Sequence, residues 1–267
     1  MPLRSYSHAL EDLYRRYNHP RYVHPDPLEF LADYPDPADR ETVALIASSL
    51  AYGRVAQILK SVRRVLDILG PRPAEALDAT PPARLARGLA GFKHRFATGR
   101  HVAALLAGIR DARRQFGSLE ACLVAGMHPG DQTVLPALSA FAGRISAASG
   151  DRCGHLLPDP ARGGACKRLH LLLRWMVRHD RVDPGGWDHL SPGMLIVPVD
   201  VHMHRLALAL GATRRRTADA RTALEITAAF RTVCPRDPAR YDFALTRLGI
   251  RPDADRAGFI QRCLALE

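Results

Sequence analysis

Helical periodicity is the feature that most constrains the fold of this chain. Within residues 55–69, apolar side chains recur at intervals of three and four residues, so that they line one face of a helix. Gly70-Pro71 follows and ends this predicted helix. The sequence contains no convincing alternating strand pattern and no internal repeat. The pattern therefore predicts an all-α protein, with further helices over residues 41–51, 102–116, 119–126 and 133–148.

Segments rich in glycine and proline divide the chain into about ten predicted helices. The longest of them, residues 149–164 (SGDRCGHLLPDPARGG), is polar enough to run over the surface. With 267 residues, the chain is long enough to form two helical lobes. We expect residues 35–150 to form a helical bundle, and residues 1–34 to join 155–267 in the second lobe.

The charge of the chain favours a polyanionic partner. Its formal net charge is +11, which is consistent with binding to nucleic acid. Only three of the basic side chains are lysines, at positions 60, 93 and 167. Arginine cannot replace lysine where a deprotonated amine is needed, so these lysines are the more informative cations.

Several classes of protein are disfavoured by the sequence. No stretch approaches the roughly 18 apolar residues of a membrane span, and the N-terminal residues lack the apolar core of a signal peptide. The five cysteines show no CxxC spacing, which disfavours an iron–sulfur cluster or a Cys-rich zinc site. We therefore expect a cytoplasmic protein, monomeric, with no membrane partner, no metal and no cofactor.

A lysine stands at the start of the helix that follows the 149–164 segment. This helix is expected to begin near Ala165, which places Lys167 in its first turn, facing away from the core. The positive end of the helix favours the neutral amine there, as nucleophilic catalysis requires. A solvated lysine is the alternative. The expected apolar stripe holds Leu169, Leu172, Leu173 and Met176, and the expected polar stripe holds Lys167, His170, Arg174 and Arg178.

An aspartate stands before the helix that ends at Gly211. Asp200 follows the apolar run that ends at Pro198, and it fits the N-cap position, where its carboxylate accepts backbone N–H groups. These hydrogen bonds favour the ionised carboxylate at neutral pH. A purely structural cap is the alternative.

Taken together, these two segments resemble the helix-hairpin-helix DNA glycosylase superfamily. The resemblance is carried by Cys166-Lys167-Arg168 and by Val199-Asp200-Val201-His202-Met203-His204-Arg205. It implies a two-lobed helical fold that binds damaged double-stranded DNA, in which Lys167 attacks the sugar C1′ and Asp200 is indispensable. The segment SSLAYGR (48–54) resembles the place where such enzymes carry a motif that inserts into the DNA stack, which makes Tyr52 and Arg54 candidates.

A more specific resemblance covers nearly the whole chain. The segments GFKHRF (91–96), CKRLHLLLRWMVR (166–178), GGWDHL (185–190), PVDVH (198–202) and DPARYDFALTRLG (237–249) are similar to those of the DUF2400 family. The hairpin signature LPGVG is absent ahead of Lys167, where the chain reads RGGAC, so the hairpin is atypical. The long separation between Lys167 and Asp200 resembles the archaeal 8-oxoguanine glycosylase branch. That branch implies a glycosylase with AP lyase activity that removes an oxidised purine, with 8-oxoguanine as the first candidate.

Further residues are candidates for contacts with DNA. The expected phosphate-binding or DNA-facing groups are Arg162, Gly163, Gly164, Arg168, His202 and Arg205. Asp237 and Pro238 fit the cap and the first turn of a helix, and the resemblance to the glycosylases, in which a C-terminal helix lines the base pocket, implies that this helix presents it. There the ring of Tyr241 or Phe243 would stack on a flipped base, and the Asp242 carboxylate would accept its N–H groups. The alternative is that the two aromatic rings lie in the core and Asp242 in a salt bridge.

Two other functions remain open from the sequence. The chain could be a DNA-binding protein that keeps the fold without catalysis. Alternatively, Asp200 and His204 share one helix face and could bind a metal in a hydrolase, whereas His202 points elsewhere.

Overall fold

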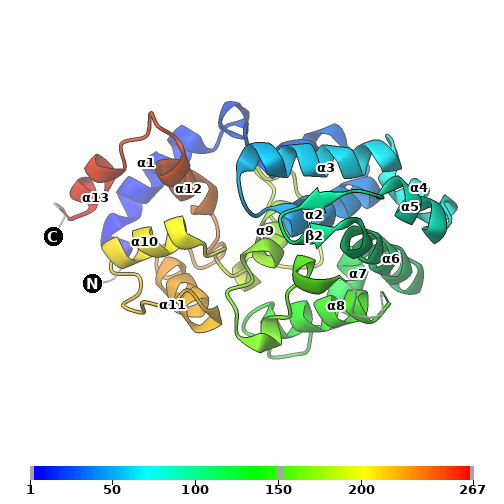
Figure 1. Ribbon diagram of the computed structural model, residues 1–267. Coiled ribbons are helices and arrows are strands. Elements are labelled where there is room, and N and C mark those ends of the chain that lie inside the picture. Colours follow the sequence, from blue (N-terminus) through cyan, green and yellow to red (C-terminus); the bar gives the residue numbers. More distant parts are fainter. Residues whose placement is uncertain (1–2, 149–152, 265–267) are drawn as a thin grey trace.

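The computed structural model describes residues 3–148 and 153–264, and these are mostly helical (Figure 1). The α-helices are α1 (Ser7–Tyr17), α2 (Pro37–Leu50), α3 (Val55–Leu69), α4 (Pro73–Ala79), α5 (Pro82–Gly88), α6 (Gly99–Phe116), α7 (Leu119–Val124), α8 (Leu135–Ala148), α9 (Lys167–Val177), α10 (Val201–Ala209), α11 (Ala220–Arg231), α12 (Asp242–Ile250) and α13 (Arg256–Leu264). Short 3₁₀ helices are η1 (Leu3–Tyr6), η2 (Pro20–Tyr22), η3 (Pro27–Asp33), η4 (Gly154–Leu156), η5 (Pro160–Arg162) and η6 (Pro192–Met194).

The helical periodicity of the sequence is confirmed. Helix α3 has the predicted bounds, and most of its predicted apolar face is buried, although Val55 is exposed and Leu59 is half-buried. It ends at Gly70, whose φ of 75° suits a residue without a Cβ. Helix α6 begins three residues earlier than predicted because Thr98 and His101 form a reciprocal capping box that stabilises its first turn.

A β-hairpin was not predicted. Strands β1 (Lys93–His94) and β2 (Ala97–Thr98) pair antiparallel, with Lys93 opposite Thr98 and His94 opposite Ala97 (Figure 1). Each strand has two residues, which is too short for an alternating pattern to be visible in the sequence.

Two apolar clusters divide the described residues, and the division differs from the predicted lobes. The first cluster extends from Leu28 to Leu195 and also takes in Ala239 and Phe243. The second combines residues 3–17 with residues 196–263. In Figure 1, α9 lies between the side formed by α2–α8 and the side formed by α1 and α10–α13.

The 149–164 segment does not separate the two clusters. Its residues 149–152 lie outside the described residues, and its later part carries η4 and η5. Leu156 and Leu157 of this segment pack into the first cluster, as does most of α9. Helix α9 is buried on almost every side, and most of its buried side chains pack in the first cluster, although the polar segment directly precedes the helix.

The polar stripe predicted for α9 does not face solvent. The predicted apolar stripe is buried as expected, but His170, Arg174 and Arg178 are buried as well, each at most 3% exposed. Helix α9 therefore places charged side chains inside the protein. Their burial requires paired carboxylates, because a lone buried charge is strongly destabilising.

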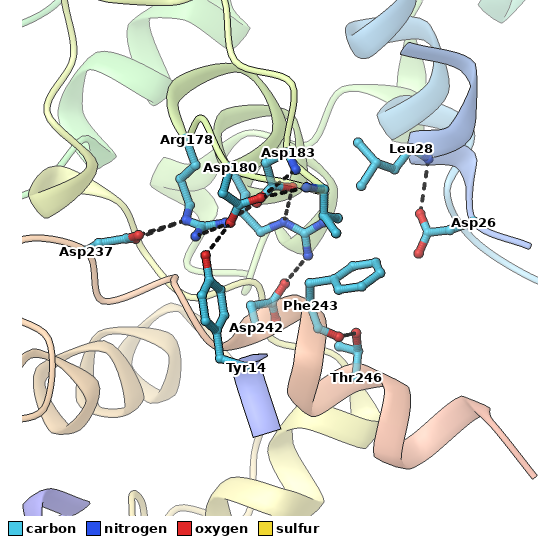
Figure 2. A network of polar contacts seen from close by, with 12 residues as sticks. Tyr14, Asp26, Leu28, Arg178, Asp180, Asp183, Asp237, Asp242, Phe243 and Thr246 are labelled. Carbon is cyan, nitrogen blue, oxygen red and sulfur yellow. Dashed lines mark hydrogen bonds and ion pairs between the residues drawn. The ribbon is translucent and has the colours of Figure 1, made fainter. Parts of the chain in front are cut away.

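Four aspartates surround the two buried arginines of α9. Arg174 donates to Asp183 at 3.2 Å and to Asp242 at 2.6 Å. Arg178 pairs with Asp180, Asp183 and Asp237, as Figure 2 shows. These six residues are called the α9 ion network below.

The α9 ion network joins the two apolar clusters. Asp242 begins α12, and Tyr14 of α1 donates its hydroxyl to Asp180 at 2.9 Å (Figure 2). Both helices pack in the second cluster, whereas α9 packs in the first. Hydrogen-bonded charges of this kind fix the relative position of packed elements more strictly than apolar contacts do, because their geometry is directional.

Loss of Asp183 is expected to destabilise the protein strongly. Asp183 is fully buried and accepts from both arginines, so Asp183→Ala leaves two buried cations short of a partner. We expect the free energy of unfolding to fall by about 3–5 kcal/mol in urea denaturation. Glu75→Ala removes an exposed ion pair with Arg72 and is the matched control, with an expected change of at most about 1 kcal/mol. Equal small losses in both variants would contradict this account of the network.

Candidate active site

Lys167 and Asp200 meet in the structure. Lys167 is the first residue of α9, and its Nζ donates to Asp200 Oδ2 at 2.8 Å. Asp200 is the N-cap of α10, and its Oδ1 accepts from the backbone N–H groups of His202 and Met203, both at 2.9 Å. The predicted first-turn position of Lys167 and the predicted N-cap of Asp200 are confirmed. Both carboxylate oxygens of Asp200 thus accept hydrogen bonds, Oδ1 from the backbone and Oδ2 from Lys167.

The Asp200 carboxylate is held in its ionised form. Burial by itself disfavours the charge, but the Lys167 ammonium, its hydrogen bond and the N–H of Met203 outweigh that effect. The pKa of Asp200 therefore lies below its usual value. At neutral pH the site holds a fixed negative charge whose orientation is set by the start of α10.

A cavity of about 830 Å³ opens over this pair. Its walls come from residues 24–27 at the start of η3 and from the loop between α2 and α3 with the beginning of α3. The other walls come from Lys167, from residues 200–202 at the start of α10, and from the end of α12 with residues 251–253. Its apolar lining includes Ile58 of the first apolar cluster and the exposed Ile250 of α12. Its size is in the range of cavities that enclose small organic groups.

One wall of the cavity was not foreseen from the sequence. Arg247 of α12 donates to Asp26 at 2.7 Å and to the carbonyl of Tyr22 at 2.9 Å, and its guanidinium lies 4.2 Å from the centre of the Phe243 ring. Arg247 and Asp26 both line the cavity. Asp26-Pro27 is a recognisable helix start, and Asp26 caps η3. Nothing in the sequence, however, links Asp26 to Arg247, which lies 221 residues later in the chain.

Tyr52 and Arg54 occupy the loop between α2 and α3. Tyr52 lines the cavity, and its hydroxyl donates to the carbonyl of His94 at 3.0 Å and lies 2.7 Å from His155 Nε2. Its ring is therefore held in the wall of the cavity. Arg54 is exposed at the N-cap of α3.

Arg168 turns away from the Lys167 cavity. Its guanidinium donates to the carbonyls of Ser49, His155 and Leu156, and lies 5.0 Å from the centre of the Tyr52 ring. These contacts tie the end of α2 to η4 and use the donors that a DNA phosphate would need. The role of Arg168 seen in the structure is therefore to position the loops around the site.

The residues of the predicted hairpin line a separate cavity. Arg162 and Gly164 border a space of about 910 Å³ with Cys166 and Arg168, and Gly163, with φ of 78°, ends η5. The chain enters α9 from η5, a 3₁₀ helix of three residues, and Cys166 takes the left-handed conformation at the N-cap. Arg162, Gly163 and Gly164 are exposed.

The α10 candidates lie on different faces of their helix. His202 is exposed and lines the Lys167 cavity, and Arg205 is exposed as well. His204 is buried, and its Nε2 lies 2.8 Å from the carbonyl of Arg215. In residues 3–148 and 153–264, no group of three or more His, Cys, Asp or Glu side chains could hold a metal ion. The metal-hydrolase alternative gains no support.

The three predicted base-pocket residues lie in the protein interior. Tyr241, Asp242 and Phe243 are each at most 4% exposed, and none of them lines the Lys167 cavity. The helix begins at Asp242, later than predicted, because Asp237 pairs with Arg178 and does not cap it. The structure thus shows the alternative arrangement, with the rings in the core and Asp242 in an ion pair with Arg174.

The charges of Lys167 and Asp200 nevertheless act on Asp242. Burial raises its pKa, although Arg174 and Lys167 act in the opposite direction, and the Asp200 carboxylate raises it further. Its Oδ1 is buried and has no hydrogen-bond partner among the described residues. The end of the α9 ion network is therefore electrostatically coupled to the candidate active site.

Comparisons with known proteins place the chain in a family. The profile of DUF2400, described as "Protein of unknown function (DUF2400)", matches residues 26–251. No curated protein and no solved structure matches the chain. No helix among the described residues has both the length and the apolar character needed to cross a bilayer. The matched segment begins at Asp26 and ends at Arg251, which both line the cavity, and it includes Lys167 and Asp200. The chain is therefore a member of the DUF2400 family.

Proposed function

We propose that this protein is a DNA glycosylase with AP lyase activity, of the helix-hairpin-helix type, that removes an oxidised purine. The observation that carries the proposal is the contact between Lys167 Nζ and Asp200 Oδ2, 2.8 Å long, at a cavity of about 830 Å³. An amine that can attack C1′ and an ionised carboxylate that can stabilise positive charge on the sugar, placed at one cavity, suit a metal-free glycosylase and lyase reaction.

Asp200 would act first, as a fixed charge. Breaking the N-glycosidic bond sends its electron pair to the base and leaves positive charge on the sugar. Asp200 is held by two backbone N–H groups, so its carboxylate need not reorient as that charge develops. The site would therefore stabilise the transition state more than the intact nucleotide.

Lys167 would act as the nucleophile. Transfer of a proton from the Lys167 ammonium to Asp200 Oδ2, to which it is hydrogen bonded, would free the nitrogen lone pair that forms the new bond to C1′. The C1′–O4′ bond then breaks, one of the two remaining protons of the nitrogen passes to O4′, and an iminium remains. Loss of a C2′ proton from this iminium expels the 3′ phosphate by β-elimination, which is the lyase reaction.

The charge around the cavity suits a DNA backbone. Residues 42–66 and 79–110 in the first cluster contain no aspartate or glutamate, and neither do residues 201–218 in the second. These stretches carry exposed cations such as Arg54, Arg95 and Arg205, and two of them, residues 42–66 and 201–218, contain residues that line the cavity. Phosphates attract such surfaces regardless of base sequence.

The cavity has the mixed lining that recognition of a flipped base needs. Apolar groups such as Ile58 and the prolines at 25 and 27 offer flat contact, and Arg247 and His202 offer polar groups. A base turned out of the duplex is read by stacking and by hydrogen bonds to its edge. The preference for an oxidised purine, with 8-oxoguanine first, rests on the resemblance of the chain to the archaeal 8-oxoguanine branch.

Removal of the Lys167 amine is expected to abolish covalent trapping. Wild-type protein incubated with an abasic duplex and borohydride should give a protein–DNA adduct, in the presence of EDTA as well. Lys167→Ala should give none, and Lys167→Arg, which retains the charge, should also give none because arginine stays protonated. Trapping of either variant at the wild-type rate would refute the assignment of Lys167.

Neutralisation of Asp200 is expected to slow base removal while DNA binding persists. Asn keeps the N-cap of α10 but lacks the charge, so Asp200→Asn isolates the electrostatic role. Single-turnover excision should fall by a factor on the order of 10²–10³. Unchanged excision would show that the carboxylate is a structural cap.

The preferred lesion is expected to be a purine. The measurement is excision from duplexes that each carry one of 8-oxoguanine, hypoxanthine, uracil, thymine glycol or 3-methyladenine. We expect release of 8-oxoguanine to be fastest. Preferential release of an oxidised or deaminated pyrimidine would contradict the substrate while leaving the roles of Lys167 and Asp200 intact.

A further inference from the structure

An aromatic ring stands in solvent beside the candidate active site. Phe96 is 72% exposed, which makes it the most exposed of the large hydrophobic side chains described. Phenylalanine ordinarily gains stability from burial, so a lone exposed ring forgoes that gain. Exposed apolar groups of this kind commonly mark a surface that another molecule covers.

The hairpin holds this ring out under backbone strain. Arg95 and Phe96 form the tip between β1 and β2, and Arg95 has φ of 51°, in the left-handed region that favours glycine. Such conformations persist where the surrounding structure imposes them, and they concentrate at functional sites.

The base of the hairpin is anchored. His94 is fully buried, and its ring nitrogens lie 2.9 Å from Ser61 Oγ and 3.0 Å from the carbonyl of Tyr52. The Tyr52 hydroxyl donates back to the His94 carbonyl. His94, two residues before Phe96, is fixed by these hydrogen bonds. The backbone that carries the Phe96 ring therefore loses little conformational freedom when the ring binds a partner.

The hairpin tip lies at the rim of the Lys167 cavity. A Cβ added to Gly53, a cavity-lining residue, would come within 2.9 Å of Arg95 Cδ. The rings of Phe96, His155 and Tyr52 follow one another edge to face, with centroids 6.1 Å and 5.3 Å apart, and Tyr52 itself lines the cavity. A row of rings thus connects the exposed tip with the site.

The charge at the tip selects the kind of partner. Lys93, Arg95 and Arg100 are exposed, and residues 79–110 contain no carboxylate. A flat aromatic face among exposed cations is complementary to stacked nucleobases flanked by phosphates.

From these observations we infer that Phe96 inserts into the base stack of DNA whose damaged nucleotide occupies the Lys167 cavity, and fills the gap that the displaced nucleotide leaves. The inference rests on the proposed function, and it assigns to Phe96 the inserting role that the sequence suggested for Tyr52 and Arg54. Tyr52 is fixed in the cavity wall by its hydroxyl contacts, whereas the Phe96 ring projects into solvent.

The test compares DNA with and without a stack to fill. Fluorescence anisotropy measures the Kd for a duplex that carries a tetrahydrofuran abasic analogue, and for the single strand with the same analogue. Phe96→Ala should weaken binding to the duplex by roughly tenfold, the lower end of what a lost base–aromatic contact costs, and should change binding to the single strand less than twofold. Phe96→Trp, which retains a planar ring, should bind the duplex as the wild type does.

The control replaces another exposed apolar side chain. Leu208 of α10 is 38% exposed and does not line the cavity, so Leu208→Ala should bind both DNAs as the wild type does. An unchanged Kd of Phe96→Ala for the duplex, or an equal loss on both DNAs, would overturn the inference.

Borohydride trapping separates this inference from the proposed chemistry. Lys167-dependent trapping together with an unaltered Kd of Phe96→Ala overturns only the stacking role of Phe96. Duplex binding that depends on Phe96, without any trapped adduct in the wild type, supports the stacking role and overturns only the lyase chemistry.

Discussion

The ion pairs of Arg174 and Arg178 are the constraint on which the rest of the structure depends. They lie on a helix that is buried on almost every side, so their charges must be matched inside the protein. The matching aspartates come from the loop after α9, from the loop before α12 and from α12 itself. These directional ion pairs therefore oppose rotation or displacement of α9 between the two apolar clusters. That placement sets where its first residue, Lys167, points.

The site is a consequence of this arrangement. Lys167 begins the helix that the ion network holds, and Asp200 begins the helix that packs beside α12 in the second cluster. Neither helix brings the two groups together alone. Their contact at 2.8 Å arises because the network fixes α9 against the second cluster, and the cavity opens where the two clusters meet. Asp242 belongs to the network, and the charges of Lys167 and Asp200 act on its carboxyl group, so the network and the site are electrostatically coupled.

Local rules of the sequence predicted much of this. The bounds of α3, the first-turn position of Lys167 and the N-cap of Asp200 depend on periodicity and on neighbours a few residues away, and each is confirmed. The burial of His170, Arg174 and Arg178 was not predicted, because a polar face on a helix normally indicates solvent. The aspartates that pair with the two arginines lie up to 68 residues away along the chain, as Asp242 does from Arg174. No local sequence pattern indicates these pairs.

By itself, the sequence determined the helical class, the bounds of α3 and the two helix starts that carry Lys167 and Asp200. These features follow from side-chain spacing and from hydrogen bonds within a single turn. Only the tertiary structure decided which polar face is buried, that Arg247 and Asp26 line the cavity while Tyr241, Asp242 and Phe243 do not, and that Phe96 stands in solvent beside Tyr52. The reason is that these outcomes depend on which distant segment supplies a partner for each buried charge, and that choice is made by the packing of the whole chain.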